Sequence, residues 1–153
     1  VERVMQSAQR EHGRADPFMS RSANEGFARV AVSGFFMQLD PTVDELTDIK
    51  IAVSEAVTNA IVHGYREKNG TVYITMRILA GNVAYVKIRD CGCGIEDVKR
   101  AMEPLYTTAP EEERAGLGFA VMQSFMDTVR VRSAMGKGTT VVMTKALRTR
   151  IDE

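Results

Sequence analysis

Cysteine and tryptophan are scarce in this chain. Its 153 residues include two cysteines, Cys91 and Cys93, and no tryptophan. A C-x-C pair is too close in sequence for an easy structural disulfide, and no further cysteine completes a zinc site. This cysteine usage favours a reduced, intracellular protein.

Long apolar runs and net charge are also missing. No stretch approaches the roughly 18 apolar residues of a membrane span, and the opening VERVMQSAQREHGR lacks a signal-peptide pattern. The 20 basic and 20 acidic residues cancel, which removes the usual electrostatic argument for nucleic acid, although a local charged patch is still compatible with it. We therefore expect a cytoplasmic protein with no membrane association and no direct nucleic-acid partner.

The length and the hydrophobic content of 44% suit one domain with its own core. Residues 1–16 are polar and aperiodic, and we interpret them as a flexible N-terminal arm or a frayed helix. Residues 17–147 then form the domain, with a possible short edge strand at 18–20, and residues 148–153 form a C-terminal tail.

Periodicity within the domain alternates between helical and strand patterns. Apolar residues recur at helical spacing over 24–39 and again from Thr42, where Glu45 completes a capping-box pattern, to about His63. Shorter helices are predicted over 96–102 and 116–127, and residues 103–115 are predicted to be a long functional loop. Strands are predicted over 71–79, 83–89, 128–133 and 139–146. Three main helices beside a mixed, largely antiparallel sheet make an α+β two-layer sandwich.

A first candidate motif lies in the second helix, where Glu55, Asn59 and His63 are spaced four residues apart. This spacing places them on one helical stripe. A carboxylate there suits a general base, and an amide oxygen suits Mg²⁺. A solvated helix face would explain the same spacing without any chemistry.

A second motif, Asp-Cys-Gly-Cys-Gly over residues 90–94, follows a predicted strand. Asp90 could accept a hydrogen bond from the exocyclic amine of a nucleobase. Gly92 and Gly94 could allow positive φ and close backbone approach to a ligand. An ordinary Asp-initiated turn is the alternative, and the two cysteines are most simply small fillers, with a redox switch as the less favoured explanation.

A third motif, Arg-Ala-Gly-Leu-Gly over residues 114–118, opens the predicted helix at 116–127. Free amides at a helix N-terminus bind phosphate well, and Arg114 could contact a terminal phosphate. Loop-to-helix glycine pairs are common, so this motif is not specific by itself. Residues 136–139, GKGT, do not fit a P-loop and are interpreted as a hairpin turn from which Thr139 could contact a ligand.

The ordered set of motifs resembles the GHKL ATPase/kinase superfamily. Its N box corresponds to the helix with Glu55 and Asn59, and its two glycine boxes correspond to residues 90–94 and 116–118. The stretches NEGFARVAV, QLDPTVDELTDIKIAVSEAVTNAIVHGY, IRDCGCGI, PLYTTAPEEERAGLGFAVMQSFMD and GKGTTV are most similar to bacterial anti-sigma serine kinases, in particular the anti-sigma-F factors of endospore formers. The similarity covers roughly residues 20–145.

The resemblance implies roles for individual residues. Glu55 would be the catalytic base and Arg114 would offset charge on the transferred phosphoryl group, while Asn59 would hold Mg²⁺. Asp90 would hold adenine above Gly92 and Gly94, and residues 103–115 would form an ATP lid. Arg29 matches a position used for partner contact. The remaining nucleotide contacts implied for ATP or ADP are His63, Thr107, Thr108, Gly116, Leu117, Gly118 and Thr139.

The resemblance also implies a homodimer that binds and inhibits sigma-F. It implies that this homodimer phosphorylates a serine of an anti-anti-sigma protein with Mg·ATP. Two alternatives stay open: a kinase serving a stress-response sigma factor, and a nucleotide-gated sigma-binding module without kinase activity. A sensor histidine kinase domain fits less well, because neither His12 nor His63 lies in a His-Glu-x-x-x-Pro setting.

Overall fold

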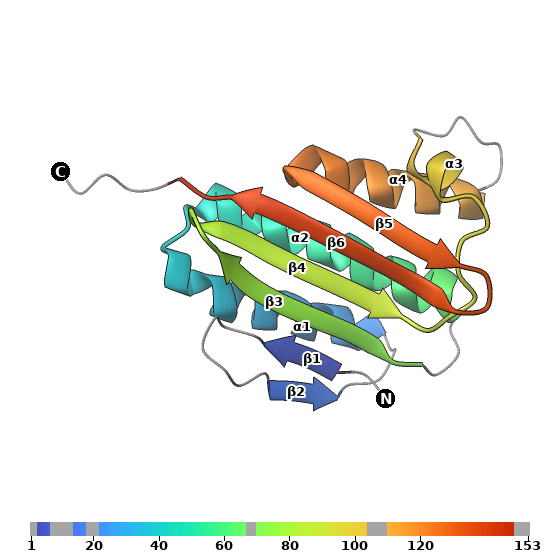
Figure 1. Cartoon of the computed structure of the whole chain (residues 1–153), viewed down its shortest axis with the longest axis horizontal. Helices are drawn as coiled ribbons and strands as arrows, with labels where there is room; N and C mark the ends of the chain where they lie inside the picture. The colour runs from blue at the N-terminus through green and yellow to red at the C-terminus, as the bar shows by residue number, and fades with distance from the viewer. Residues whose placement is uncertain (1–2, 7–13, 18–21, 67–69, 104–109, 149–153) are drawn as a thin grey trace.

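A six-stranded sheet with its long helices on one face forms the frame of the molecule (Figure 1). The computed structural model describes residues 3–6, 14–17, 22–66, 70–103 and 110–148. The strands are β1 (Arg3–Gln6), β2 (Arg14–Pro17), β3 (Val72–Leu79), β4 (Val83–Asp90), β5 (Thr128–Ala134) and β6 (Gly138–Ala146). The helices are α1 (Ser22–Phe36), α2 (Val43–Asn59), α3 (Val98–Met102) and α4 (Pro110–Phe125).

The strand order is β2-β1-β3-β4-β6-β5. All neighbours pair antiparallel except β1 and β3, which pair parallel. The predicted α+β sandwich is therefore confirmed, including the four predicted strands and the β5–β6 hairpin.

Alternation along the strands separates the two faces of the sheet. In β4 every second residue, from Ala84 to Asp90, is buried beneath the helices. Val141 and Met143 of β6 join the same core, which α2 completes through Ala52, Val53 and Val57. Met122, Met126 and Met143 are each at most 5% exposed, and Met102 packs against the core. These methionines are therefore part of the hydrophobic core.

Helix α2 begins at the predicted cap. The Thr42 hydroxyl accepts from the Glu45 amide and the Glu45 carboxylate accepts from the Thr42 amide, which completes the capping box. The helix continues past Asn59 as a π-helical turn, Ala60–Gly64. A π-helical turn contains one more residue than an α-helical turn and is frequent at functional sites.

The N-terminal segments differ from the sequence prediction. Two short strands, β1 and β2, lie where a loose arm or a frayed helix was expected, because the edge of β3 offers unpaired backbone groups to a further strand. The possible edge strand at 18–20 lies outside the described residues. The proposed domain boundaries at 16 and 147 remain predictions.

Helix α4 also differs from the prediction, since it begins at Pro110 rather than at Gly116. The sequence PEEERA explains the earlier start: proline suits the first helical position, and Glu, Arg and Ala are strong helix formers. Of the predicted loop 103–115, residues 110–115 are therefore helical, and 104–109 lie outside the described residues.

Candidate nucleotide site

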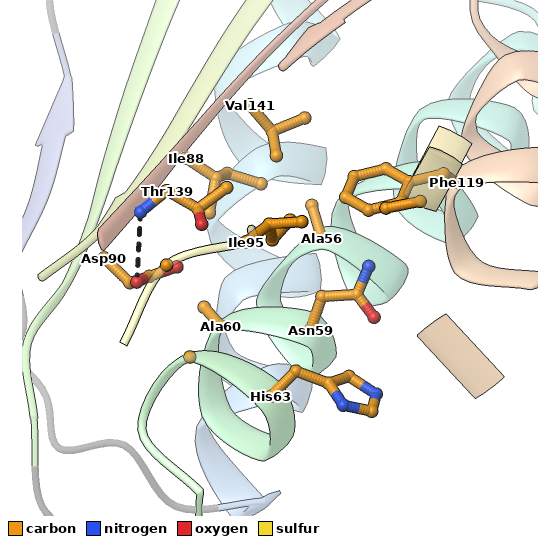
Figure 2. Close-up of a pocket in the computed structure, with 13 residues that line it drawn as sticks. Ala56, Asn59, Ala60, His63, Ile88, Asp90, Ile95, Phe119, Thr139 and Val141 are labelled. Carbon is orange, nitrogen blue, oxygen red and sulfur yellow. Dashed lines mark hydrogen bonds between the residues drawn. The ribbon is translucent and has the colours of Figure 1, made fainter. Parts of the chain in front are cut away.

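A pocket of about 120 Å³ lies between the sheet, the C-terminal end of α2 and helix α4 (Figure 2). Its lining is mostly apolar, with a few convergent polar groups, which is typical of small-molecule sites. The lining residues are Ala56, Asn59, Ala60, His63, Gly64, Ile88, Asp90, Gly94, Ile95, Ala101, Phe119, Thr139 and Val141.

Asp90 is the buried carboxylate of this pocket and is only 5% exposed. Its Oδ1 accepts from the Gly92 amide at 2.9 Å and from the Thr139 amide at 3.3 Å. Both hydrogen bonds go to Oδ1, and Asp90 lines the pocket, where its carboxylate can meet a ligand amine. Burial raises the pKa of Asp90 above its usual value, although the two amide hydrogen bonds act in the opposite direction.

Backbone contacts hold the turn after Asp90 in place. The Cys93 amide donates to the Gly64 carbonyl at 2.8 Å, and the Gly136 amide donates to the Cys93 carbonyl at 2.8 Å. A Cβ on Gly92 would lie 2.1 Å from the Gly64 carbonyl oxygen. The turn is thus fixed between the end of α2 and the β5–β6 hairpin.

The predicted roles of the two turn glycines need one correction. Gly94 adopts the expected positive φ of 79°. Gly92 does not adopt a positive φ, and its close approach is to the Gly64 backbone. Cys91 is exposed, and the half-buried Cys93 donates its thiol to the His63 carbonyl at 3.2 Å. Both cysteines are free thiols.

Asn59 brings an unsatisfied amide to the pocket. Its Nδ2 is buried and has no hydrogen-bond partner among the described residues, and such a group costs free energy until something satisfies it. A Cβ on Gly118 would lie 2.9 Å from Asn59 Nδ2 and 3.0 Å from Oδ1. Helix α4 therefore covers the Asn59 carboxamide in this conformation, and an alanine at position 118 would require that carboxamide to shift.

Glu55 lies one turn before Asn59 and lines a separate groove of about 350 Å³ between α1 and α2. Burial raises the pKa of Glu55, and the negative charge of Glu25 adds to this effect. Arg29 lines the same groove and forms an ion pair with Glu25 at 3.6 Å. The helical stripe predicted from the sequence is thus divided: Asn59 and His63 line the pocket, and Glu55 lines the groove beside it.

The second glycine box is not where the sequence analysis expected it. Gly116, Leu117 and Gly118 lie inside helix α4 rather than before it. Amides in a helix interior are used by the helix, so the predicted phosphate site at a helix N-terminus is not formed in this conformation. Arg114 also belongs to α4, but its side chain is outside the described part, and Thr107 and Thr108 fall outside the described residues.

Some residues of the site were not predicted from the sequence. Phe119 forms the α4 wall of the pocket, and Ile95 and Ala101 contribute to its lining. The Tyr65 hydroxyl accepts from the Cys91 amide at 2.8 Å and donates to the Thr71 carbonyl. Only the pairing of distant segments reveals these contacts, so no local sequence signal could have identified them.

Comparison with known proteins identifies the family. The histidine kinase-like ATPase domain family matches residues 20–145. The anti-sigma F factor of Thermoanaerobacter sp. (strain X514) is 56% identical over 128 residues, which is 84% of this chain and 89% of that protein. The anti-sigma F factor of Clostridium acetobutylicum is 52% identical over the same shares. The chain belongs to the anti-sigma F factor family.

Solved structures of histidine kinases share the fold of this chain. The histidine kinase domain of the Erythrobacter litoralis EL346 blue-light activated histidine kinase superposes with a TM-score of 0.56 at 20% identity, covering 82% of this chain and 60% of that one. The mycobacterial sensor histidine kinase MprB gives a TM-score of 0.53 at 21% identity, covering 67% of this chain and 72% of that one. Membership in an ATPase-domain family carries ATP binding with it.

Within the described residues, no helix is long and apolar enough to cross a bilayer. Within the same residues, no cluster of three His, Cys, Asp or Glu side chains could hold a metal ion.

Proposed function

We propose that the chain is an ATP-dependent protein serine kinase that also binds and inhibits sigma-F. The observation that carries the nucleotide part is the buried Asp90, which lines a mostly apolar pocket and whose carboxylate can accept from the adenine amine. His63 and Thr139 line the same pocket and would complete the contacts to ATP or ADP.

Magnesium fits the residues present. Mg²⁺ takes oxygen ligands and is usually held by one or two protein groups together with substrate phosphates. Asn59 lines the pocket and supplies an amide oxygen, which suits the ion, and its buried, unsatisfied Nδ2 is a donor that a phosphate oxygen would satisfy. When bound, the ion would neutralise phosphate charge, and Asn59 would be its protein ligand.

Helix α4 must move for a whole nucleotide to enter. The pocket holds about 120 Å³, whereas small-molecule sites are typically ~300–1,000 Å³. Displacement of the first turns of α4 would uncover Asn59 and release the amides of Gly116, Leu117 and Gly118. Arg114, Thr107 and Thr108 stay predicted phosphate or lid contacts.

The acceptor serine would approach from the groove between α1 and α2. Glu55 lies there, and a carboxylate with a raised pKa is a stronger base toward an alcohol. In phosphoryl transfer, positioning and charge neutralisation dominate, so accepting the serine proton is the main chemical task left to the protein. The new phosphate adds roughly −1.5 to −2 charge to the serine, which could weaken its hold on the kinase.

The exposed face of α1 is the proposed contact for protein partners. Arg29 is exposed there, and its neighbours Phe27 and Val30 are 47% and 69% exposed. Exposed aromatic and apolar side chains and an exposed arginine are typical of protein interfaces. Sigma-F and a serine-bearing anti-anti-sigma protein would both use this face, and we propose a homodimer as the active form.

The test is a Glu55→Gln variant incubated with labelled ATP and the candidate anti-anti-sigma protein. We expect serine labelling to fall by about 10²–10⁴, with ATP affinity nearly unchanged because Glu55 lies outside the pocket. Glu96→Gln, at an exposed position, is the matched control.

Labelling at the wild-type rate would remove Glu55 as the base. A wild-type protein that binds ATP and sigma-F but transfers no label would instead support the nucleotide-gated binding module.

A further inference from the structure

The long helices cover one face of the sheet and leave the other uncovered (Figure 1). The uncovered face is strongly basic. Burial alternation turns one set of residues of β3, β4, β5 and β6 away from the core. Within the described strands β3–β6, this outward-facing set contains five cations and no Asp or Glu. We call it the basic sheet face: Arg77, Lys87, Arg89, Arg130 and Arg132.

The strand register arranges four of these cations in two parallel rows, and Arg77 lies in a third row beside Tyr85. One row runs across the sheet from Arg132 through Thr140 to Arg89 and Tyr73. The next row runs from Arg130 through Val142 to Lys87. Cations within one row lie two strands apart, about 10 Å, and the rows are separated by about 7 Å along the strands.

The rings of the two tyrosines on this face fix two of the arginines. The Arg89 guanidinium lies 4.4 Å from the centre of the Tyr73 ring, and the Arg77 guanidinium lies 5.5 Å from that of Tyr85. A guanidinium held in this way presents its donors in a fixed geometry that matches carboxylates. Because the whole chain carries no net charge, this concentration of charge is a property of position and not of composition.

We propose that the basic sheet face docks an acidic protein segment, one with several Asp or Glu side chains that spans β4 to β5. Charge complementarity carries the choice of partner. A second copy of this chain would bring five cations against five, and a single-stranded nucleic acid would need open aromatic rings for its bases, whereas arginines cover both tyrosines. The surface lies opposite the nucleotide pocket, so its use is independent of the proposed kinase reaction.

The test measures the affinity of a labelled oligo-glutamate peptide by fluorescence anisotropy. The variant is Arg130→Glu/Arg132→Glu, and the matched control is Lys99→Glu/Arg100→Glu, which makes the same charge change at exposed positions of α3. We expect a loss of about tenfold or more for the sheet variant, since two attractions become two repulsions, and less than about twofold for the control. Wild-type affinity should fall as salt increases.

Further measurements separate the alternatives. Arg130→Lys/Arg132→Lys keeps the charge and should lose only part of the affinity, and it replaces the glutamate variant if that variant fails to fold. ATP affinity should be unchanged in all of them, which distinguishes this proposal from failure of the nucleotide site.

Several results would overturn the proposal. The first is that the wild type does not bind the peptide, and the second is that the α3 control loses as much peptide affinity as the sheet variant. The third is that the wild type binds a single-stranded oligothymidylate of matched charge more tightly than the peptide. A change of oligomeric state in the sheet variant, measured by sedimentation, would assign the face to a second copy of the chain.

Discussion

Gly118→Ala is predicted to make the protein more stable and worse at binding nucleotide. In the interior of a helix, alanine is favoured over glycine by about 0.8–1.0 kcal/mol. The added Cβ would lie 2.9 Å and 3.0 Å from the two polar atoms of the Asn59 carboxamide. These atoms are the end of a rotatable side chain, so Asn59 can shift at a modest cost.

The expected net gain in the free energy of unfolding is about 0.5 kcal/mol, the helix gain less the cost of moving Asn59. Nucleotide binding should weaken by about tenfold or more for two reasons. Asn59 is displaced from its position, and a more stable α4 resists the displacement of its first turns that we propose for nucleotide entry. Each 1.4 kcal/mol of added cost weakens the binding affinity about tenfold.

Urea unfolding and isothermal titration with Mg·ATP measure the two effects separately. Gly34→Ala is the matched control, because Gly34 lies inside helix α1 and nothing lies within 4 Å of an added Cβ. It should gain the full helix contribution and leave ATP affinity unchanged. An unaltered ATP affinity in Gly118→Ala would refute the reasoning, and a loss of stability above about 1 kcal/mol would show that Asn59 cannot shift.

Three further predictions concern titratable groups. Asp90→Asn should weaken ATP binding by about tenfold to a hundredfold, the range for a hydrogen bond to a charged group, in calorimetric titration. Because burial raises the pKa of Asp90, ionisation of this carboxyl destabilises the folded state as pH rises through that pKa. Asp90→Asn should therefore be at least as stable as the wild type at pH 7, and a clear loss of stability at that pH would contradict this reasoning. Kinase activity should decrease as pH falls through the raised pKa of Glu55 and should not follow that pKa in Glu55→Gln. Burial alone would raise the pKa of Glu45, but hydrogen bonds from the Arg148 and Thr42 amides lower it. The contribution of Glu45 to folding stability is therefore present above the pKa of the unfolded state and is lost as pH falls through the pKa of the folded state. Glu45→Ala should therefore cost about 0.5–2 kcal/mol in urea unfolding at pH 7, and no cost would show that the capping box is unimportant.

The sheet and the long helices could be predicted because their signals are local. The capping box at Thr42 and the alternating strands of the β3–β4 hairpin depend on residues close in sequence. The start of α4 was missed because the glycines at 116 and 118 were given more weight than the helix-forming residues before them. Strand β1 was missed because its pairing with β3 joins segments about seventy residues apart.

The site could be predicted in part for the same reason. Asp90, Asn59, His63 and Thr139 do line one pocket, and their motifs are short enough to recognise. The separation of Glu55 into a neighbouring groove depends on how α1 packs on α2, which no motif encodes. The contact between Asn59 and Gly118 likewise exists only after α4 has docked on α2.

The turn beneath the pocket is anchored through main-chain atoms and by the lack of a side chain at position 92. Residue 91, whose side chain is exposed, could therefore be exchanged for others with little effect on the position of Asp90. Residue 93 also contributes the thiol hydrogen bond to the His63 carbonyl. Any side chain larger than a hydrogen atom would instead collide with a carbonyl oxygen 2.1 Å from its Cβ, that of Gly64 for position 92 and that of Asp90 for position 138. Substitutions of Cys91 should thus be tolerated in this turn, whereas substitutions of Gly92 or Gly138 should disrupt it.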